Sequence, residues 1–335
     1  MMKINTFTIS LPLSLVCLIT CAPYSLPEPK AYSAKEPALT LYLQSQDLYQ
    51  LAEYPDALLK IDSAITINQN FAQFFELKGD ILRKLNQVEP ALRAYQTAIL
   101  QRSNNTRAYI NIADLYHQQN HFRESIRYYR KALTLDTTLI PVYLEITRNY
   151  ISLKEWEIAL NILEDYRRQS LVSGRPPGTE YYFLKGKSCF YQKNYQMAIQ
   201  ELLQYRHEKQ PNREVLALLG RSHFALNNFE GGLKYFNKLI RMDAVHGEWY
   251  YYRGIYFYQV NNLEDSMNQL QMALEIDSTL YNCHYYLGKI YEQRGDDKKA
   301  VEEFRLYRES MRQLKDLGTG QDEIRDLEGF EEDQY

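Results

Sequence analysis

Three basic residues recur at regular spacing and could bind an acidic ligand. Lys187 and Arg221 are 34 residues apart, and Arg148 precedes Lys187 by the same period plus five inserted residues. If the chain folds into units of this length, the three side chains lie on consecutive units and form a line. Guanidinium and ammonium groups bind carboxylates through charge-assisted hydrogen bonds. The spacing therefore predicts a basic line suited to an extended acidic peptide or a free carboxylate.

Catalytic and metal-binding motifs are absent from the sequence. It contains no His-Glu-x-x-His, Cys-x-x-Cys, Gly-x-x-x-x-Gly-Lys, Gly-x-Gly-x-x-Gly or Gly-x-Ser-x-Gly. Cys189 and Cys283 are expected to be buried apolar residues, too far apart for a disulfide, and His223 is expected to pack in the core. The net charge of −3 argues against a nucleic-acid surface. We therefore expect no enzymatic activity, no cofactor and no metal.

A 34-residue repeat must position the basic line. Counted from Thr106, aromatic residues stand at positions 4, 11, 17 and 24, and small residues at positions 8, 20 and 27. Two amphipathic helices joined by a short polar turn explain this spacing. The repeats begin at Ala38, Ala72, Thr106, Ile140, Thr179, Arg213, Gly247 and Tyr281.

Small residues occupy two positions of every repeat. Position 8 holds Ser45, Gly79, Ala113, Thr147, Gly186, Gly220, Gly254 and Gly288, and position 20 holds Ala57, Ala91, Ser125, Ala159, Ala198, Gly232, Ser266 and Ala300. Two antiparallel helices approach closely where both lack a bulky side chain. One such pair of helices cannot bury both of its faces, so the repeats must stack.

This pattern resembles the tetratricopeptide repeat, a 34-residue helix-turn-helix unit. The resemblance covers residues 38 to about 314 and implies an all-α fold, a right-handed α-solenoid of about eight repeats. We expect the polar helix Arg305–Leu317 to cap the last repeat.

The resemblance also implies a binding groove, because the first helix of each tetratricopeptide repeat lines the concave surface through positions 2, 5, 9, 12 and 13. The basic line stands at position 9, and large aromatic residues stand near it in repeats five to eight. We therefore expect a peptide-binding groove with exposed aromatic groups. Its predicted residues are Arg148, Lys187, Arg221, Phe183, Phe190, Tyr191, Phe224, Tyr251, Tyr258 and Tyr285.

Two segments interrupt or follow the repeats. Residues 38–178 hold repeats one to four and end in an insertion, Gln169–Gly178, whose prolines and glycines predict a surface loop. A hinge or a partner contact is the alternative. Residues 179–317 hold repeats five to eight and the capping helix, and residues 318–335 form an acidic tail. The tail is expected to be solvated, or alternatively to fold onto the protein's own groove.

Residues 1–21 have the pattern of a bacterial lipoprotein signal peptide. Lys3 precedes an uncharged apolar run that is too short for a comfortable membrane span. The run ends Leu18-Ile19-Thr20-Cys21, which resembles a lipobox, with Thr20 where Gly or Ala is usual. The resemblance implies that Cys21 is lipidated. An ordinary secreted protein, an uncleaved anchor and a misread cytosolic start are the alternatives.

A proline-rich tether follows the leader. Residues 22–37 contain four prolines, and 16 extended residues reach roughly 50 Å at ~3.1 Å each. By the sorting rule of Gram-negative lipoproteins, Ala22 points to the outer membrane, facing the periplasm. In layout the chain resembles bacterial tetratricopeptide lipoproteins that help assemble envelope machines, such as secretin pilotins of type IV pili.

These observations predict a membrane-tethered scaffold without catalytic activity. It would bind a protein or peptide partner in the groove and recruit or assemble an envelope complex. One alternative is an adaptor that regulates an envelope protease or a cell-wall enzyme. The other is a cytosolic co-chaperone, which requires that the leader be misread.

Overall fold

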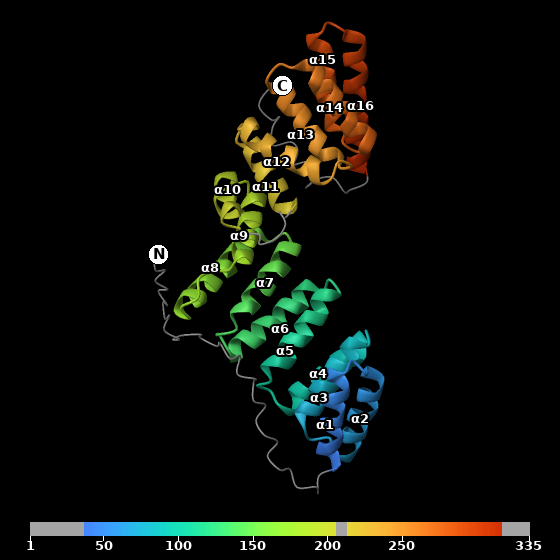
Figure 1. Ribbon diagram of the computed structural model, residues 1–335, viewed down its shortest axis with the longest axis vertical. Helices are drawn as coiled ribbons and strands as arrows, with labels where there is room; N and C mark the ends of the chain where they lie inside the picture. Colours follow the sequence, from blue (N-terminus) through green and yellow to red (C-terminus); the bar gives the residue numbers. More distant parts are fainter. Residues whose placement is uncertain (1–36, 206–212, 317–335) are drawn as a thin grey trace, which may run out of the picture. The chain divides into compact units, whose positions relative to one another are not determined.

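The computed structural model describes residues 37–205 and 213–316, which form sixteen helices and contain no strand (Figure 1). The helices alternate along the chain as the first and second helices of the repeats, so the predicted all-α repeat fold is confirmed. They are α1 (Pro37–Gln50), α2 (Tyr54–Ile67), α3 (Ala72–Lys84), α4 (Val88–Gln101), α5 (Thr106–Gln118), α6 (Phe122–Leu135), α7 (Ile140–Ser152), α8 (Trp156–Val172), α9 (Thr179–Tyr191), α10 (Tyr195–Gln204), α11 (Arg213–Ala225), α12 (Phe229–Met242), α13 (Gly247–Gln259), α14 (Leu263–Ile276), α15 (Asn282–Gln293) and α16 (Asp297–Asp316).

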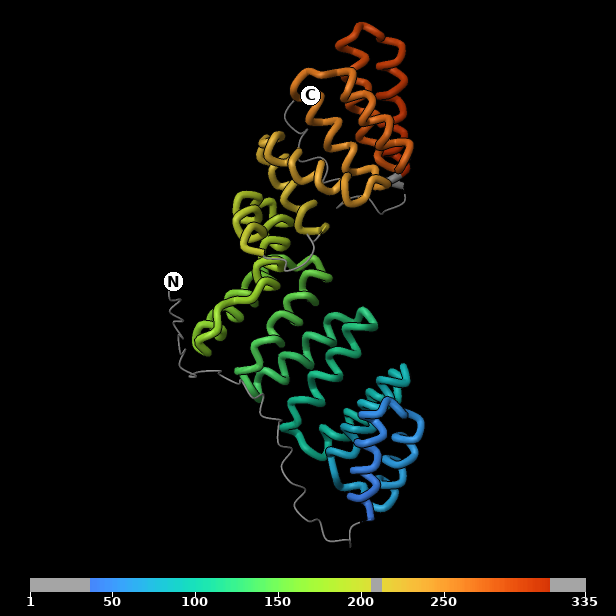
Figure 2. Tube along the Cα trace, in the orientation of Figure 1, coloured from blue at the N-terminus to red at the C-terminus, as the bar shows by residue number. Residues whose placement is uncertain are grey.

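The turn inside each repeat has one conformation. Position 15 adopts positive φ in all eight repeats and lies in the bend between successive helices whose path Figure 2 traces. The backbone N–H groups of this residue and of the next bond back to the first helix, as when Asn120 donates to His117 and His121 donates to Tyr116. Asn or Gly occupies this position in five repeats, because both tolerate the left-handed region. The turn residues are Ala52, Asn86, Asn120, Lys154, Lys193, Asn227, Asn261 and Gly295.

The small residues lie where the paired helices touch, as the sequence predicts. A Cβ atom added at Gly186 would lie 2.6 Å from Leu202 Cγ, and one at Gly288 would lie 2.7 Å from Phe304 Cε1. Both contacts join position 8 of the first helix to position 24 of the second. Ser266 occupies position 20 and donates a hydrogen bond to the carbonyl of Gly254 at 2.8 Å. The pairs are therefore held close by the absence of side-chain volume.

Contacts divide the chain into two compact units, residues 1–91 and 92–335. In the first unit, α1, α2 and α3 enclose a core that includes Ile61, Phe74 and Ile81. In the second unit the second helix of one repeat packs against the first helix of the next, as α6 does on α7 and α12 on α13. Each core therefore spans neighbouring repeats rather than one pair of helices.

Two predicted boundaries differ from the structure. The first four residues of the insertion, 169–172, continue α8, because no helix breaker precedes Gly174, which takes φ +68°. The loop proper is residues 173–178. Pro37 is the first residue of α1 rather than the end of the tether. The polar helix expected from Arg305 onward is the second half of α16, which runs without a break through the described residues.

The leader, Cys21, the tether up to residue 36 and the acidic tail lie outside the described residues. Among the helices of residues 37–205 and 213–316, none combines the length and apolar character needed to cross a membrane.

Candidate functional site: the first-helix surface of repeats four to seven

The three predicted cations each form an ion pair with a glutamate of the following repeat. Lys187 Nζ lies 2.6 Å from Glu214 Oε1. Arg148 pairs with Glu180, and also with Glu145 on its own helix. Arg221 pairs with Glu248. The glutamates stand at position 2 of repeats five, six and seven, so position 9 of one repeat meets position 2 of the next. We call these three pairs, Arg148–Glu180, Lys187–Glu214 and Arg221–Glu248, the charge ladder.

The ladder changes the electrostatics expected of a basic line. Burial disfavours the charged guanidinium of Arg148, but its bonds to Glu145 and Glu180 outweigh that effect and raise its pKa. Burial likewise opposes the charge on Arg221, and the carboxylate of Glu248 outweighs it and raises the pKa. Both guanidinium groups therefore stay charged, and each of the three cations lies beside a carboxylate of the protein itself.

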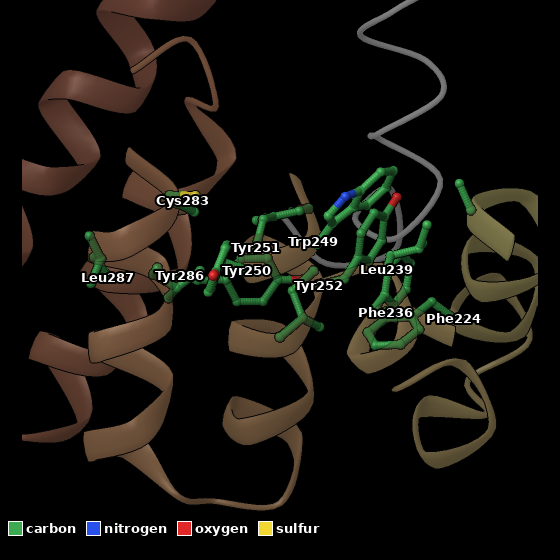
Figure 3. Packing of buried hydrophobic residues seen from close by; sticks show 14 of the residues in the cluster. Phe224, Phe236, Leu239, Trp249, Tyr250, Tyr251, Tyr252, Cys283, Tyr286 and Leu287 are labelled. Atoms are coloured by element: carbon green, nitrogen blue, oxygen red, sulfur yellow. The ribbon is translucent and has the colours of Figure 1, made fainter. Parts of the chain in front are cut away.

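The prediction of exposed aromatic groups is wrong for three of the seven residues. Phe224 is fully buried, Tyr251 is 5% exposed and Phe190 is 9% exposed. Figure 3 shows Phe224 and Tyr251 among the core side chains of the later repeats. Phe224 packs edge-on against Phe236 and Tyr252, so it fills the space between two repeats. The ring has room there because Gly232 has no side chain: an added Cβ would lie 2.3 Å from Phe224 Cδ2.

The other four aromatic groups are half-buried, and two of them contact a neighbouring repeat. Tyr191 stacks on Trp156 of the previous repeat, with ring centroids 4.4 Å apart. Tyr258 accepts a hydrogen bond from Gln293 at 3.1 Å. Each of these rings therefore exposes only part of its surface to solvent. The four half-buried residues are Phe183, Tyr191, Tyr258 and Tyr285.

Sequence reasoning missed the glutamates of the ladder, although a signal for them existed. Glu214 and Glu248 each follow a position-9 cation by 27 residues, and Glu180 follows Arg148 by the same interval plus the five inserted residues. Comparing position 9 with position 2 of the next repeat would have found all three. The surface therefore offers paired charges to a ligand, and a ligand carboxylate binds a cation there only by displacing a glutamate.

The remaining reactive side chains are structural. Cys189 and Cys283 are free and buried, as predicted, and burial raises the pKa of the Cys189 thiol to about 11. His223 stacks on Tyr235 with centroids 5.6 Å apart, and burial lowers its pKa. Within the part of the chain that the structure describes, no group of three or more His, Cys, Asp or Glu side chains is arranged to hold a metal.

Family comparisons match three stretches of the chain. Residues 79–120 match the family described as TPR repeat, and residues 106–138 and 218–280 match families described as tetratricopeptide repeat. A curated relative, TPR repeat-containing protein MJ1428 of Methanocaldococcus jannaschii, is 36% identical over 95 residues. That alignment covers 28% of this chain and 17% of the relative, so only a small part of the relative's length is matched.

Several solved structures share the fold. A tetratricopeptide repeat protein of Parabacteroides merdae is 14% identical, with a TM-score of 0.52 over 76% of this chain and 98% of its own. YrrB, described as a TPR protein with an unusual peptide-binding site, is 18% identical, with a TM-score of 0.50 over 58% of this chain and 97% of its own. The pilF protein of Pseudomonas aeruginosa is 16% identical, with a TM-score of 0.50 over 62% and 93%.

Proposed function

We propose that this chain, which is a tetratricopeptide repeat protein, is a membrane-tethered scaffold that binds an extended acidic segment of a partner protein. The binding surface is the charge ladder together with the half-buried aromatic groups beside it. Through this contact the protein recruits or assembles a complex in the bacterial envelope. The observation that carries the proposal is the ladder itself: three half-buried cations, one per repeat, each paired with a glutamate, of which Glu180 and Glu214 are exposed enough for a ligand carboxylate to replace.

Exposure and ring placement support exchange at the ladder. The side chain of Glu214 is 47% exposed and that of Glu180 is 41% exposed, so both can swing into water when a ligand arrives. Exposed ion pairs of this kind are worth only about 0–1 kcal/mol, which a ligand carboxylate can match. Lys187 also lies 5.9 Å from the centre of the Phe183 ring, so a bound peptide would meet a cation and an aromatic surface together.

The charge ladder predicts opposite changes in affinity for variants of its glutamates and variants of its cations. Replacing Glu180, Glu214 and Glu248 with Gln removes the cross-repeat partner of each cation, while Arg148 keeps Glu145. Affinity for an acidic partner should therefore rise about tenfold, roughly 1.4 kcal/mol. Replacing Arg148, Lys187 and Arg221 with Gln should lower it by a similar factor. Titration of a synthetic peptide rich in Asp and Glu, followed by fluorescence anisotropy, measures both changes.

A structural role for the ladder would give a different result. Both triple variants would then lower the melting temperature by a similar small amount, and neither would alter peptide affinity. Equal affinities among wild type and the two variants would overturn the assignment of this surface. A peptide of the same length with Lys in place of Asp and Glu is the ligand control, and its affinity should move in the reverse direction.

The membrane tether has its own prediction. Cells grown with an alkyne-tagged fatty acid should incorporate label into the wild-type chain, and Cys21→Ser should abolish that label because the thiol is the acceptor. Cys283→Ser is the matched control and should label normally, since Cys283 is fully buried. Wild-type protein that carries no label and stays in the cytosol would contradict the tether and favour the co-chaperone alternative.

A further inference from the structure

The outer face of α6 carries a row of cations. Arg123, Arg127, Arg130 and Lys131 recur at spacings of three and four residues on this helix, and all four are exposed. The row is about 12 Å long at 1.5 Å per residue. Glu124 is the single carboxylate on the helix. Residues spaced in this way share one face of an α-helix, so the four charges face solvent together.

Most of this charge is not neutralised by neighbours. Arg123 pairs with Glu155 at 2.9 Å. Across residues 37–205 and 213–316, Arg127, Arg130 and Lys131 take part in no ion pair. The α6 face therefore differs from the charge ladder, where every cation has a glutamate.

Two of the guanidinium groups are held in place by aromatic rings. Arg127 lies over the Tyr128 ring at 5.2 Å from its centre, and Arg130 lies over the Tyr150 ring at 5.8 Å. Arg130 also donates a hydrogen bond to the Tyr150 hydroxyl at 2.8 Å. Rigid guanidinium groups lose less freedom when they bind and can grip phosphate with two parallel hydrogen bonds.

The other outer helices do not repeat this arrangement. On α12, Lys234, Lys238 and Arg241 are exposed beside Glu230. The last helix, α16, exposes five cations among its described side chains, but these are interspersed with glutamates, two of which pair with Arg305. By contrast, α14 carries Glu264, Asp265 and Glu275 and no cation. The basic character therefore belongs to particular helices and not to the outer surface as a whole.

We infer that the α6 face is a docking surface for the phosphate headgroups of anionic lipids. The inference rests on the proposed membrane tether, which would keep the chain close to a bilayer surface and raise the local concentration of headgroups. Each Lys or Arg near an anionic bilayer contributes to binding, and several together give stable adsorption. On α6 the exposed large apolar side chain is Leu135, 40% exposed at the last residue of the helix. One partly exposed leucine gives little apolar area to insert, so the row suits contact with headgroups.

A nucleic acid fits the observations less well. Binding to a duplex requires cations along an extended path, because affinity grows with the number of phosphates neutralised. The α6 row is one short cluster on a chain of net charge −3. The lipid assignment also agrees with the position of the predicted acylation site at the start of the same chain.

The test uses vesicles of phosphatidylcholine with or without phosphatidylglycerol and the full chain carrying Cys21→Ser. Removing the acyl chain lets the weaker surface contact be measured, and the rest of the leader is common to every arm. Arg127→Gln with Lys131→Gln should lower the apparent binding constant for anionic vesicles about 30-fold. Lys234→Gln with Lys238→Gln occupies the same repeat positions on α12, changes net charge equally, and should change binding less than ~3-fold.

The outcomes separate this inference from the proposed function. Equal losses for the α6 and α12 variants, or no loss for either, would overturn the α6 assignment. So would tighter binding of the chain to a DNA or RNA duplex than to anionic vesicles, if the α6 variant removed it. The tether is judged separately on neutral vesicles, where the lipidated wild type should bind and Cys21→Ser should bind more weakly.

Discussion

Gly232→Ala should destabilise repeat six by about 2 kcal/mol, although Ala is the better helix former by ~1 kcal/mol. An added Cβ at Gly232 would lie 2.3 Å from Phe224 Cδ2 and 2.8 Å from the carbonyl oxygen of Gly220. The second contact is with backbone and cannot be relieved by turning a side chain. The packing penalty should therefore exceed the gain in helix propensity. Whether the variant is less or more stable than wild type shows which effect is larger.

Hydrogen exchange is the suitable measurement, because a stack of repeats need not unfold in one step. Amides of α11 and α12 should exchange faster in the variant, while those of α1 and α2 should not change. Gly178→Ala is the matched control: its Cβ would meet no atom closer than 4.0 Å, and its φ of −78° is open to any residue. Unchanged or slower exchange in α12 of Gly232→Ala would refute the close approach.

Lys185→Met should cost about 3 kcal/mol, because it leaves a buried carboxylate without a partner. Lys185 Nζ lies 2.9 Å from Glu201 Oε1, and these side chains are only 18% and 11% exposed. Burial opposes the charge on Lys185, but its contact with the Glu201 carboxylate outweighs that effect and raises the pKa of the ammonium. Chemical denaturation followed by circular dichroism, with exchange of α9 and α10 amides, measures the loss.

Two further variants distinguish a buried pair from an ordinary surface lysine. Lys187→Met removes a cation two residues away on the same helix, and its partner Glu214 is 47% exposed. That change should cost at most ~1 kcal/mol. Lys185→Met combined with Glu201→Leu should recover most of the stability lost by Lys185→Met alone, because no buried charge remains. Equal losses for Lys185→Met and Lys187→Met would contradict this account.

The helices could be predicted from the sequence with little error. All eight second helices begin at position 17 of the predicted register, and six of the eight first helices begin at position 1. This accuracy follows from the repeat, because every repeat has the same spacing of apolar and small residues. A helix start misplaced in one repeat would disagree with the 34-residue period of the others. The insertion after repeat four lacks this support, and there the end of α8 was misplaced by four residues.

The candidate site was predicted only in part. The three cations lie at the predicted position, but their partners come from the next repeat and were not found. Among the aromatic residues, Phe224 is core and Tyr258 is half-buried, although both stand at position 12. Position within a repeat gives the direction of a side chain, whereas the volume of the neighbouring repeat determines whether water reaches it.

The sequence by itself determined the repeat length, the antiparallel helix pairs and the small residues at their contacts, because these depend on periodicity within one unit. The tertiary structure decided which charges pair and which rings are covered. Those outcomes depend on side chains of adjacent repeats that meet across the stack, such as Arg221 and Glu248. A contact between two repeats depends on how those repeats pack together, and the sequences of both repeats determine that packing.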